Sequence, residues 1–542
     1  MAGTMTRTTT LPGRPLGHPG EPPLVAPSRM ARSVGALRRV TGTVWIWPML
    51  VMAVIGGHGI TAAVMWRDEL ATWQAASRSV AQLWRMVHNV DAVLGVYYLG
   101  MHFWMALFGD SPAAMRVPSL IAMTGTAGLV AVTGRRLGGP TAGLVAGLVF
   151  AVIPSVSRFA QEARPYALVM FFTALATLLL LRALERPRWP QWALYALAIA
   201  AAGALNVLAL CLLTGHALCA AMRCWRPGQD SAGRRRDVAL GFGLAALAGV
   251  ILDLPVIIAG HRQVVEQIGG HARPGLSSLL GQYGAIRLWP ELFYSTGVAV
   301  AVLVLAAASL RGPSLRASAY TLATAFVPIA VLWTASQGPI SYWYIRYLMF
   351  TVPAWAVAVG LGIVGMEPRP AAARRARGMG VAAMVALVAI LGIPGQHALR
   401  QAEAHNWWSY PDPLYGYPAN YAGAAKVIAE HERPGDGIVF KRDDRWMVDI
   451  GVDYYLRGQA KPADVFLVRT PAQAGRLNAV ECARPARCLR GEPRLWIVYQ
   501  GYERDPYAAI EPAKAAALRA ARYTTQRIYA EDGLIVALMT RE

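Results

Sequence analysis

Charged residues are scarce in this chain of 542 residues. Asp, Glu, Lys and Arg together make up 15% of the sequence, whereas hydrophobic residues make up 55%, and the mean hydropathy is +0.36. Soluble proteins average about 25% charged residues, so the composition argues against an ordinary soluble globular protein. Apolar runs of about 17–25 residues, long enough to cross a bilayer, recur over the first 395 residues. The sequence therefore predicts a polytopic α-helical membrane protein.

Acidic residues are outnumbered by basic ones, with 31 Asp and Glu against 52 Lys and Arg and a formal net charge of +21. Such an excess would suit nucleic acid if the basic residues formed one patch. They lie instead in short loops between apolar runs, as in the cytoplasmic loops of membrane proteins. We therefore expect no nucleic acid partner, and we expect these arginines to contact anionic lipids of the bilayer.

The N-terminus lacks the pattern of a secretory signal. Residues 1–40 are rich in Pro, Gly, Thr and Arg with little apolar content, which predicts a disordered, basic cytoplasmic tail. The first apolar run, at about 44–64, follows this basic flank. We expect it to remain uncleaved, with the N-terminus in the cytoplasm.

Cysteine is rare, with 5 residues in the chain, and no CxxC or His/Cys spacing predicts a structural zinc site. Cys211, Cys219 and Cys224 fall in or beside predicted spans and are expected to be packing residues. Cys482 and Cys488 lie close together in a region expected outside the membrane. A disulfide and a free pair both stay open for these two.

The Arg-rich loops determine the predicted topology. If they all lie in the cytoplasm with the N-terminus, the chain crosses the membrane about 11 times and its C-terminal part lies outside. The predicted spans are 44–64, 117–134, 141–158, 166–184, 190–206, 207–222, 238–258, 291–310, 318–335, 347–366 and 379–395. The loops expected on the outer face are 65–116, 159–165, a turn near Asn206, 259–290 and 336–346.

Residues 91–109 are also apolar enough to cross, but a crossing there would invert every later Arg-rich loop. We therefore predict juxtamembrane helices over 79–109 that lie along the outer face, which suits interfacial side chains such as Trp84, His102 and Trp104. The alternative, a true span over 91–109 with one crossing lost elsewhere, stays open.

Residues 396–542 have the pattern of a small soluble α/β domain. About 145 residues can bury a core of their own. The predicted elements are helices at 421–431 and 512–521, strands at 437–441, 464–469 and 494–500, and a hairpin of 523–529 with 534–540. The chain thus divides into a tail (1–40), a transmembrane domain (41–395) and an extracytoplasmic domain (396–542).

Asp68 and Glu69 are the most informative residues, because they are adjacent carboxylates that directly follow the first span. Acidic groups at the mouth of a span are costly to place and usually functional. We take Asp68 as the candidate catalytic base and Glu69 as a second catalytic group that orients the acceptor. The alternative is that Asp68 caps the helical stretch over 69–79.

An outward-facing carboxylate in a membrane-embedded protein suits transfer from a lipid-linked donor. A sugar joined to polyprenyl phosphate has an activated anomeric carbon and a phosphate leaving group, which needs cations or hydrogen-bond donors rather than a general acid. The acceptor hydroxyl needs a base, so one carboxylate suffices, and displacement in one step inverts the anomeric centre.

Further outer segments supply candidate substrate-binding residues. Gln161, Glu162, Arg164 and Tyr166 follow a span, and Arg116 opens another span, where an arginine can bind a phosphate bidentately. The alternatives are a loop ion pair for the first group and snorkelling toward the interface for Arg116.

The aromatic stretch 341–347 contains Tyr344 and Arg346, and there the arginine can neutralise a lipid phosphate; the alternative is an aromatic belt with an anchoring arginine. His88 and Asp91 lie near the expected cavity as further substrate-binding candidates. No cofactor is certain and no metal ligand is assigned. A divalent cation held by His88 and Asp91 with Asp68 stays an alternative.

Four motifs together carry a resemblance to a known family. Arg67-Asp68-Glu69, Gly109–Ser119, Gln161–Tyr166 and Ile345–Leu348 resemble the GT-C membrane glycosyltransferases. Family 39-like protein O-mannosyltransferases and the aminoarabinose transferase type are the most similar. The resemblance covers roughly residues 40–395.

The resemblance implies a GT-C fold, a polyprenyl-phosphate-sugar donor and inversion, with Asp68 as the base. It further implies that Arg116 and Arg346 lie near the lipid phosphate and that Glu162 is the acidic residue of the second outer loop. The chain departs from the family pattern at Asn89–Tyr98, where relatives often carry His-Pro-Pro before the aromatics. This departure leaves the sugar and the acceptor open.

We therefore predict a multi-pass plasma-membrane glycosyltransferase that moves a sugar, expected to be mannose, from polyprenyl phosphate to an acceptor hydroxyl outside. The acceptor is a protein, a lipid or a glycan. A transporter or flippase of lipid-linked sugar is the alternative, but it would need charged residues inside several spans, and Asp253 is the main one. A scaffold that binds partners through its outer domain would not need so many spans.

Overall fold

The computed structural model of the chain describes Gly3 and residues 43–225, 231–269, 272–277, 288–311, 314–366, 374–401, 419–442 and 447–542. It divides into two units, Met1–Thr43 and Val44–Glu542. The tail predicted over 1–40 falls, apart from Gly3, outside the described residues. The second unit contains a helical bundle and a smaller domain built on a β-sheet.

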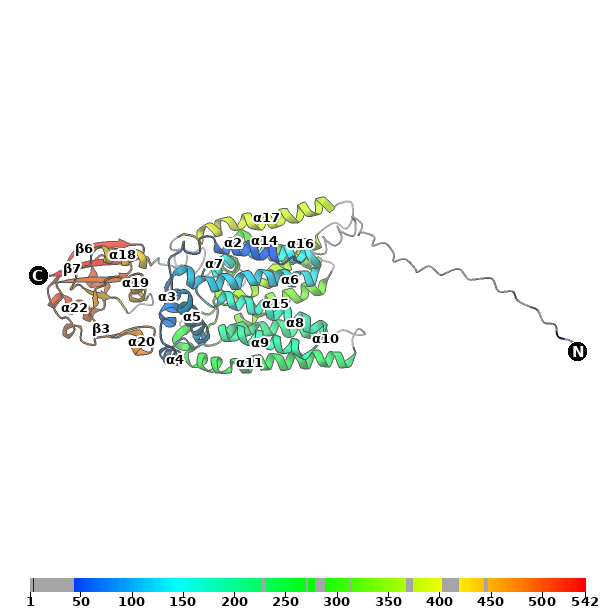
Figure 1. Cartoon of the computed structure of the whole chain (residues 1–542), viewed down its shortest axis with the longest axis horizontal. Helices are drawn as coiled ribbons and strands as arrows, with labels where there is room; N and C mark the ends of the chain where they lie inside the picture. Colours follow the sequence, from blue (N-terminus) through cyan, green and yellow to red (C-terminus); the bar gives the residue numbers. More distant parts are fainter. Residues whose placement is uncertain are drawn as a thin grey trace. The chain divides into compact units, whose positions relative to one another are not determined.

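Long apolar helices run side by side in the bundle (Figure 1). Helix α6 packs against α2, α8 and α16, and α11 packs against α9 and α10. The helices of the first half are α2 (Ile46–Gly57), α6 (Pro112–Val152), α7 (Pro154–Ala160), α8 (Tyr166–Glu185), α9 (Trp189–Leu205) and α10 (Leu212–Cys224). Those of the second half are α11 (Ala232–Ile268), α13 (Leu288–Phe293), α14 (Thr296–Ala308), α15 (Leu315–Ala335), α16 (Val352–Gly365) and α17 (Arg374–Ala398). Short 3-10 segments are η2 (Val207–Cys211), η3 (Ser309–Arg311) and η4 (Ile345–Thr351).

Every predicted span coincides with a helix, so the predicted polytopic helical fold is confirmed. Within the described ranges, seven helical segments are long and apolar enough to cross a membrane. Helix α6 covers two predicted spans, because its 41 residues bend at Gly139, whose φ of 88° suits glycine. Helices α2, α9 and α14 have only 12, 17 and 13 residues, so their crossings stay predictions.

One predicted boundary is wrong. We placed the end of a span at residue 258 and an outer loop from 259 onward, but α11 continues to Ile268. The residues that extend it, from Ala259 to Ile268, contain no Pro, and their one glycine, Gly260, lies within the helix, which tolerates a single glycine. The extension brings Gln263 and Gln267 against the segment around Asp91.

Short helices gather at the end of the bundle beside the sheet, where Figure 1 draws α3, α4 and α5. They are α3 (Arg67–Ala76), α4 (Val80–Asn89), the 3-10 turn η1 (Ala92–Leu94) and α5 (Gly95–Phe108). Helix α5 has 14 residues and packs against α3 and α4. This arrangement agrees with the prediction of juxtamembrane helices over 79–109 and not with a further span.

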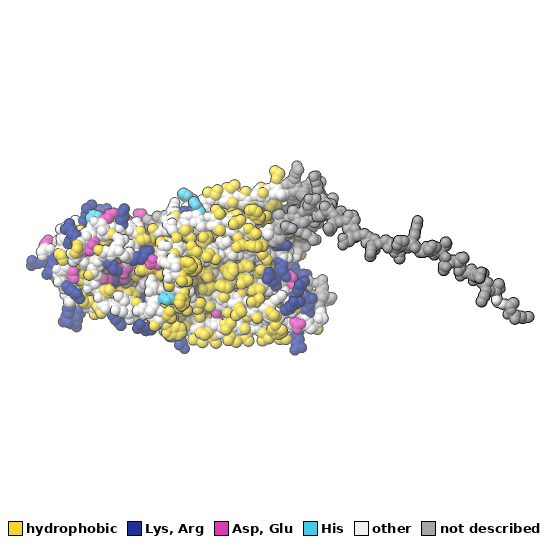
Figure 2. Space-filling view, in the orientation of Figure 1, with side chains coloured by type: hydrophobic (Ala, Val, Ile, Leu, Met, Phe, Trp, Pro, Cys, Tyr) yellow, Lys and Arg dark blue, Asp and Glu magenta, His cyan; other side chains and the backbone are white. Residues whose placement is uncertain are grey.

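Basic side chains gather at the opposite end of the bundle, beyond a broad apolar belt (Figure 2). There Glu185, at the end of α8, forms an ion pair with Arg136, and its carbonyl accepts a hydrogen bond from Arg234. Three loops that the sequence assigned to the cytoplasm therefore meet at one end. The sheet lies at the other end, as the charge pattern predicts.

The sheet domain (419–442 and 447–542) has a five-stranded sheet in the order β2-β1-β5-β7-β6 and a two-stranded sheet of β3 and β4. Strand β1 is parallel to β2 and β5, whereas β7 is antiparallel to β5 and β6. The strands are β1 (Gly437–Phe440), β2 (Ala463–Asp464), β3 (Leu467–Arg469), β4 (Val480–Glu481), β5 (Arg494–Gln500), β6 (Tyr523–Glu531) and β7 (Leu534–Arg541). The helices are α18 (Tyr421–His431), α19 (Val448–Tyr455), α20 (Pro471–Ala474), α21 (Pro506–Ala509) and α22 (Pro512–Ala520), with a 3-10 turn η8 (Pro485–Arg487).

Both faces of the central strands β1, β5 and β7 are largely buried, whereas the edge strand β6 is mostly exposed. In β5, where side chains alternate, Trp496 and Val498 pack on the side of α18 and α19, whereas Leu495 and Ile497 pack on the side of α22. The predicted helices at 421–431 and 512–521, the strands at 437–441 and 494–500 and the hairpin are confirmed. The strand predicted over 464–469 is instead two short strands, β2 and β3, in different sheets, and among the elements described the sequence missed α19, α20, α21, η8 and β4.

Helix α19 attaches the sheet domain to α3. The Tyr454 hydroxyl donates to the Asp110 carbonyl over 2.9 Å, and its ring packs edge-on against Trp73. The Tyr455 hydroxyl accepts a hydrogen bond from the Met65 backbone N–H at 2.9 Å. The sheet domain thus holds both the helix that carries the carboxylate pair and the loop before it.

Cys482 and Cys488 form a disulfide. Replacing both by serine should lower the free energy of unfolding of the sheet domain by about 2 kcal/mol, the entropy of closing so short a loop. Hydrogen exchange of β5 and β7 in the full chain measures this loss, and Cys224→Ser, which changes a free thiol in the bundle, is the control. Unchanged exchange in the double variant would show that the bond does not stabilise the domain.

Candidate functional site

The two carboxylates lie in the first turn of α3, where the helix dipole favours negative charge. Both are buried, and they face different partners. Trp66 occupies the N-cap position of this helix, and its backbone N–H donates a hydrogen bond to Glu69 Oε2 at 3.4 Å. Glu69, and not Asp68, is therefore the capping group, so the alternative role that we considered for Asp68 does not apply.

Glu69 forms a fully buried ion pair with Arg116 of α6. The guanidinium is bidentate, with Nε at 2.8 Å from Oε1 and Nη2 at 2.7 Å from Oε2. Its remaining donors reach the carbonyls of Ile60, Ala63 and Val64. A guanidinium has five N–H groups, and all five are used here. This geometry argues against the phosphate contact that we predicted for Arg116, which instead clamps Glu69 in place.

Asp68 faces two other arginines. Arg346 Nη1 lies 2.8 Å from Oδ2, and Arg67 Nη2 lies 3.1 Å from Oδ1. Burial by itself would raise the pKa of Asp68, but Arg346, followed by Arg67 and Arg164, holds this pKa well below its usual value. Asp68 is therefore an ionised carboxylate in the resting protein.

Arg346 is surrounded by aromatic rings. Its guanidinium lies 4.5 Å from the centre of the Tyr344 ring and 5.7 to 6.0 Å from the rings of Tyr347, Tyr166 and Trp66. Such contacts keep an arginine in place without neutralising it. The cation therefore remains able to exchange one anionic partner for another.

Arg164 and Asp91 extend the network around Asp68. Arg164 Nη1 lies 3.4 Å from the Asp68 carbonyl and 3.4 Å from the Tyr98 hydroxyl. That hydroxyl donates to Asp91 Oδ2 at 2.8 Å, and Gln267 donates to Asp91 Oδ1 at 3.1 Å. Asp91 is thus linked to the Asp68 backbone through one tyrosine and one arginine.

Glu162 lies in the loop before α8 and pairs with Arg158 at 3.1 Å, four residues earlier. Burial raises the pKa of Glu162, although Arg158 lowers it in part. Both groups line a cavity, called here the polar cavity. Its lining also includes Trp66, Phe159, Glu291, Tyr294, Tyr344, Ile345, Arg346 and Met349.

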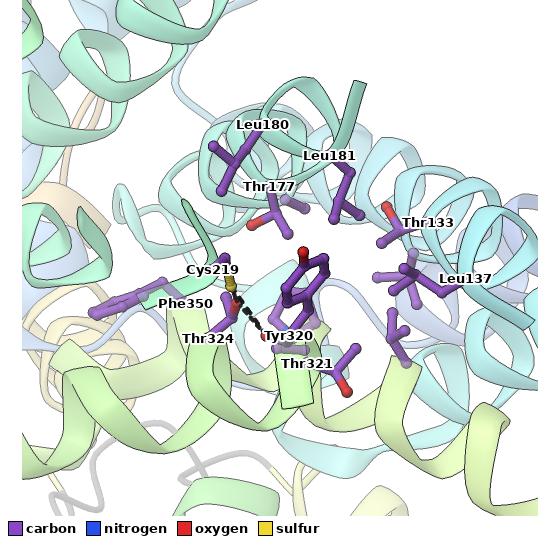
Figure 3. A pocket seen from close by; sticks show the side chains of 15 residues that line it. Thr133, Leu137, Thr177, Leu180, Leu181, Cys219, Tyr320, Thr321, Thr324 and Phe350 are labelled. Atoms are coloured by element: carbon purple, nitrogen blue, oxygen red, sulfur yellow. Dashed lines mark hydrogen bonds between the residues drawn. The ribbon is translucent and has the colours of Figure 1, made fainter. Parts of the chain in front are cut away.

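A second cavity lies on the other side of η4, inside the bundle (Figure 3). This apolar cavity lies between α6, α8, α10, α15 and α16, and none of the residues that line it is charged. Met349 lines the polar cavity and the next residue, Phe350, lines the apolar one. A single 3-10 segment therefore separates a charged site from an apolar one.

The remaining predicted residues lie elsewhere. Gln161 donates to the carbonyls of Gly56 and His58 and so holds a loop rather than a ligand. His88 is exposed, and its ring contacts Trp84. In the described part of the chain, no three His, Cys, Asp or Glu side chains form a group that could hold a metal ion. The divalent cation that we considered as an alternative for His88, Asp91 and Asp68 therefore has no support from the described residues.

The structure also adds residues that the sequence analysis missed. Arg158 contributes a second cation to the polar cavity, and its spacing from Glu162 on consecutive helical turns could have indicated the pair. Tyr98, which connects Asp91 to Arg164, lies in the segment Asn89–Tyr98 that departs from the family pattern, but its contact with Arg164, 66 residues away, could not be predicted from the sequence.

Comparisons with known proteins agree with this architecture. A family model described as dolichyl-phosphate-mannose-protein mannosyltransferase matches residues 95–251. The structure is similar to ArnT from Cupriavidus metallidurans bound to undecaprenyl phosphate, with a TM-score of 0.56 and 15% identity over 94% of this chain and 98% of that chain. Its similarity to the apo state of ArnT gives a TM-score of 0.54, with the same identity and coverage. No curated protein sequence matches the chain. The predicted resemblance to the GT-C membrane glycosyltransferases and the predicted fold are confirmed.

Replacing Glu69 by Gln should destabilise the protein strongly, because it leaves the Arg116 charge buried without its carboxylate. Removing one partner of a buried pair costs about 3–5 kcal/mol. Thermal unfolding of the purified protein measures the loss. The matched control is Glu185→Gln, which breaks the exposed pair with Arg136 and should cost about 1 kcal/mol or less. Equal losses in the two variants would contradict the structural role of Glu69.

Proposed function

We propose that the chain is an inverting glycosyltransferase that moves a sugar from polyprenyl phosphate to an acceptor hydroxyl. The observation that carries this proposal is the pair of cavities on either side of η4, with Asp68 and Arg346 beside the polar one. A charged site next to an apolar one suits a ligand with a phosphate at the end of a hydrocarbon chain. A carboxylate at the same place suits the activation of a hydroxyl.

The donor phosphate is proposed to bind Arg346 and Arg158. Both line the polar cavity, and arginine binds phosphate oxygens bidentately. The isoprenoid chain is proposed to enter the apolar cavity past Phe350. Aromatic rings of Trp66 and Tyr344 line the space left for the sugar.

Asp68 is proposed to act as the base after Arg346 has changed partner. In the resting protein Arg346 pairs with Asp68 and keeps it a weak base. A donor phosphate competes for Arg346, so donor binding releases the carboxylate and its pKa rises toward the usual value. Asp68 then takes the proton of the acceptor hydroxyl while the hydroxyl oxygen bonds to the anomeric carbon. The bond between the anomeric carbon and the phosphate oxygen breaks, and polyprenyl phosphate leaves with its electron pair. One displacement inverts the anomeric centre.

Several details extend this proposal. The sugar is proposed to be mannose, and the acceptor a protein, lipid or glycan outside the plasma membrane. The N-terminus is then cytoplasmic and the sheet domain extracytoplasmic, which is supported by the basic loops at the far end of the bundle and by the disulfide between Cys482 and Cys488.

A transporter of lipid-linked sugar is the second candidate, and Asp253 is the observation that favours it. This carboxylate is buried in α11, and its Oδ2 has no hydrogen-bond partner among the described residues. Intramembrane acids of this kind often mark transport pathways. A transporter would also need to bind the lipid phosphate, but it has no use for a carboxylate base such as Asp68 beside the arginine, and we therefore favour the transferase.

Asp68→Asn should reduce transfer about 10²–10⁴-fold, because it removes the general base while conserving shape. The assay uses purified protein in lipid with polyprenyl-phospho-mannose and a mixed acceptor extract. Asp237→Asn, an exposed carboxylate at the far end of the bundle, is the control and should transfer at the wild-type rate. Equal transfer by Asp68→Asn would assign the base to another carboxylate, and transport of the donor without any transfer would favour the second candidate.

The pH dependence of transfer should be governed by Glu162 rather than by Asp68. The pKa of Asp68 is held low, so its protonation limits the rate only below about pH 4. The pKa of Glu162 is raised, so its protonation begins above about pH 4.3 and weakens its hold on Arg158. We expect kcat/KM for the donor to fall on acidification of the wild type, at a pH above the ordinary range of a glutamate. The Glu162→Gln variant should transfer slowly and at a rate that does not change with pH over the same interval. If its rate fell on acidification as the wild-type rate does, this assignment would be contradicted.

A further inference from the structure

A third cavity lies between α3 and the sheet domain, away from the polar and apolar cavities. This interface cavity has a volume of about 390 Å³, within the range of ligand pockets. The residues that matter here are Trp73, Arg78, Phe440, Asp453, Lys461 and Asp464, all of which line it. Nothing in the proposed transfer step uses this space.

The cavity lies at the carboxyl ends of two parallel strands. β1 ends at Phe440 and β2 ends at Asp464, and both residues line the cavity. In open sheets with helices on both faces, ligands bind in the crevice outside the carboxyl ends of the parallel strands. The position is therefore the one where an α/β domain most often holds a ligand.

The acidic groups that line this cavity all have cationic partners. Asp449 and Asp464 pair with Arg442, and Asp453 pairs with Lys461 at 2.7 Å. The pairing leaves one lining cation, Arg78, without a carboxylate within salt-bridge distance in the described part of the chain.

Arg78 is only 3% exposed, yet its guanidinium is incompletely bonded. Nη2 donates to the Gln74 side chain at 2.7 Å and to the Arg476 carbonyl at 2.6 Å. Nε and Nη1 have no hydrogen-bond partner among the described residues. Burial without an acidic neighbour lowers the pKa of Arg78 to about 10, which still leaves it charged at neutral pH. A buried cation with unused donors is costly unless an anion completes it.

We propose that the interface cavity binds an anionic saccharide segment of the acceptor, with Arg78 as the ligand of its phosphate or carboxylate group. The unused Nε and Nη1 donors lie on different sides of the guanidinium, because the Nε–H points to the side of Nη2, and each can donate one hydrogen bond to an oxyanion. Asp464 Oδ1 also lacks a partner and accepts a hydrogen bond from a sugar hydroxyl. Trp73 and Phe440 supply flat apolar surfaces for the rings.

The position of the cavity links it to the reaction. Trp73 follows Asp68 by five residues on the same helix, a rise of roughly 8 Å. A saccharide held at Arg78 therefore needs few further units to bring a hydroxyl to Asp68. The assignment of this ligand to the acceptor rests on the proposed transferase function, whereas the anion site itself does not.

Equilibrium binding of small sugars to the full-length protein, without donor, tests the site. The probes are glucose 6-phosphate, glucuronate and uncharged glucose. We expect at least about tenfold tighter binding of a charged sugar than of glucose. Whichever of the two charged probes binds more tightly identifies a phosphate or a carboxylate as the natural group.

Arg78→Gln should abolish the preference for charged sugars, and Arg78→Lys should retain part of it. Arg504→Gln, an exposed arginine outside the cavity, should bind as the wild type does. Equal binding of charged and uncharged sugars by the wild type, or an unchanged preference in Arg78→Gln, would overturn the proposal. If binding is found but the protein transfers no sugar, the proposed function fails and the anion site stands.

Hydrogen exchange of the wild type provides a second test if Arg78→Gln does not fold. Glucose 6-phosphate or glucuronate should protect the segments that surround the cavity, around residues 74–78, 449–456 and 463–472, and glucose should not. Absence of protection there would equally overturn the proposal.

Discussion

The buried ion pair of Glu69 and Arg116 is the interaction on which the arrangement of the site depends. It joins α3 to the start of α6, and through the carbonyls of Ile60 and Ala63 it fixes the loop after the first helix. Glu69 also accepts a hydrogen bond from the Ala163 N–H at 2.9 Å, which ties in the loop that carries Glu162. A buried charge pair is stabilising only when every polar atom is satisfied, and here the arginine has no donor left over. This ion pair therefore holds α3, the start of α6, the loop after the first helix and the loop that carries Glu162 together.

The neighbouring pair of Asp68 and Arg346 has the opposite character. The side chain of Asp68 is 10% exposed and that of Arg346 is 19% exposed. Arg346 contacts aromatic rings, whereas Arg116 has all its donors bonded to oxygen atoms. Little stabilising free energy is therefore lost when another anion replaces Asp68 as the partner of Arg346. The adjacent residues Asp68 and Glu69 thus have different roles. Glu69 is held by an arginine whose donors are all used, whereas the arginine that pairs with Asp68 can exchange its anionic partner.

The sequence predicted the bundle, the sheet domain and the carboxylate pair, because apolar runs, alternation in 494–500 and charges at span ends are local signals. It did not predict α19, since Gly451 is a poor helix former; the glycine is required there because the Tyr421 ring lies where a Cβ would be. The role of Arg116 could not be predicted either, because three of its hydrogen-bond partners are backbone carbonyls more than fifty residues away. Spacing along the chain shows that an arginine is near a site, but only the fold shows how many of its donors are already used.

The attachment of α19 to α3 has a consequence for how such proteins can be recombined. Tyr454 and Tyr455 contact Trp73, Asp110 and Met65, all of which belong to the membrane part of the chain. A sheet domain exchanged between residues 401 and 419 would therefore lack the surface that these tyrosines contact. The natural module for exchange is the sheet domain together with the segment from Met65 to Asp110, so α3 and the sheet domain are expected to be inherited as one block.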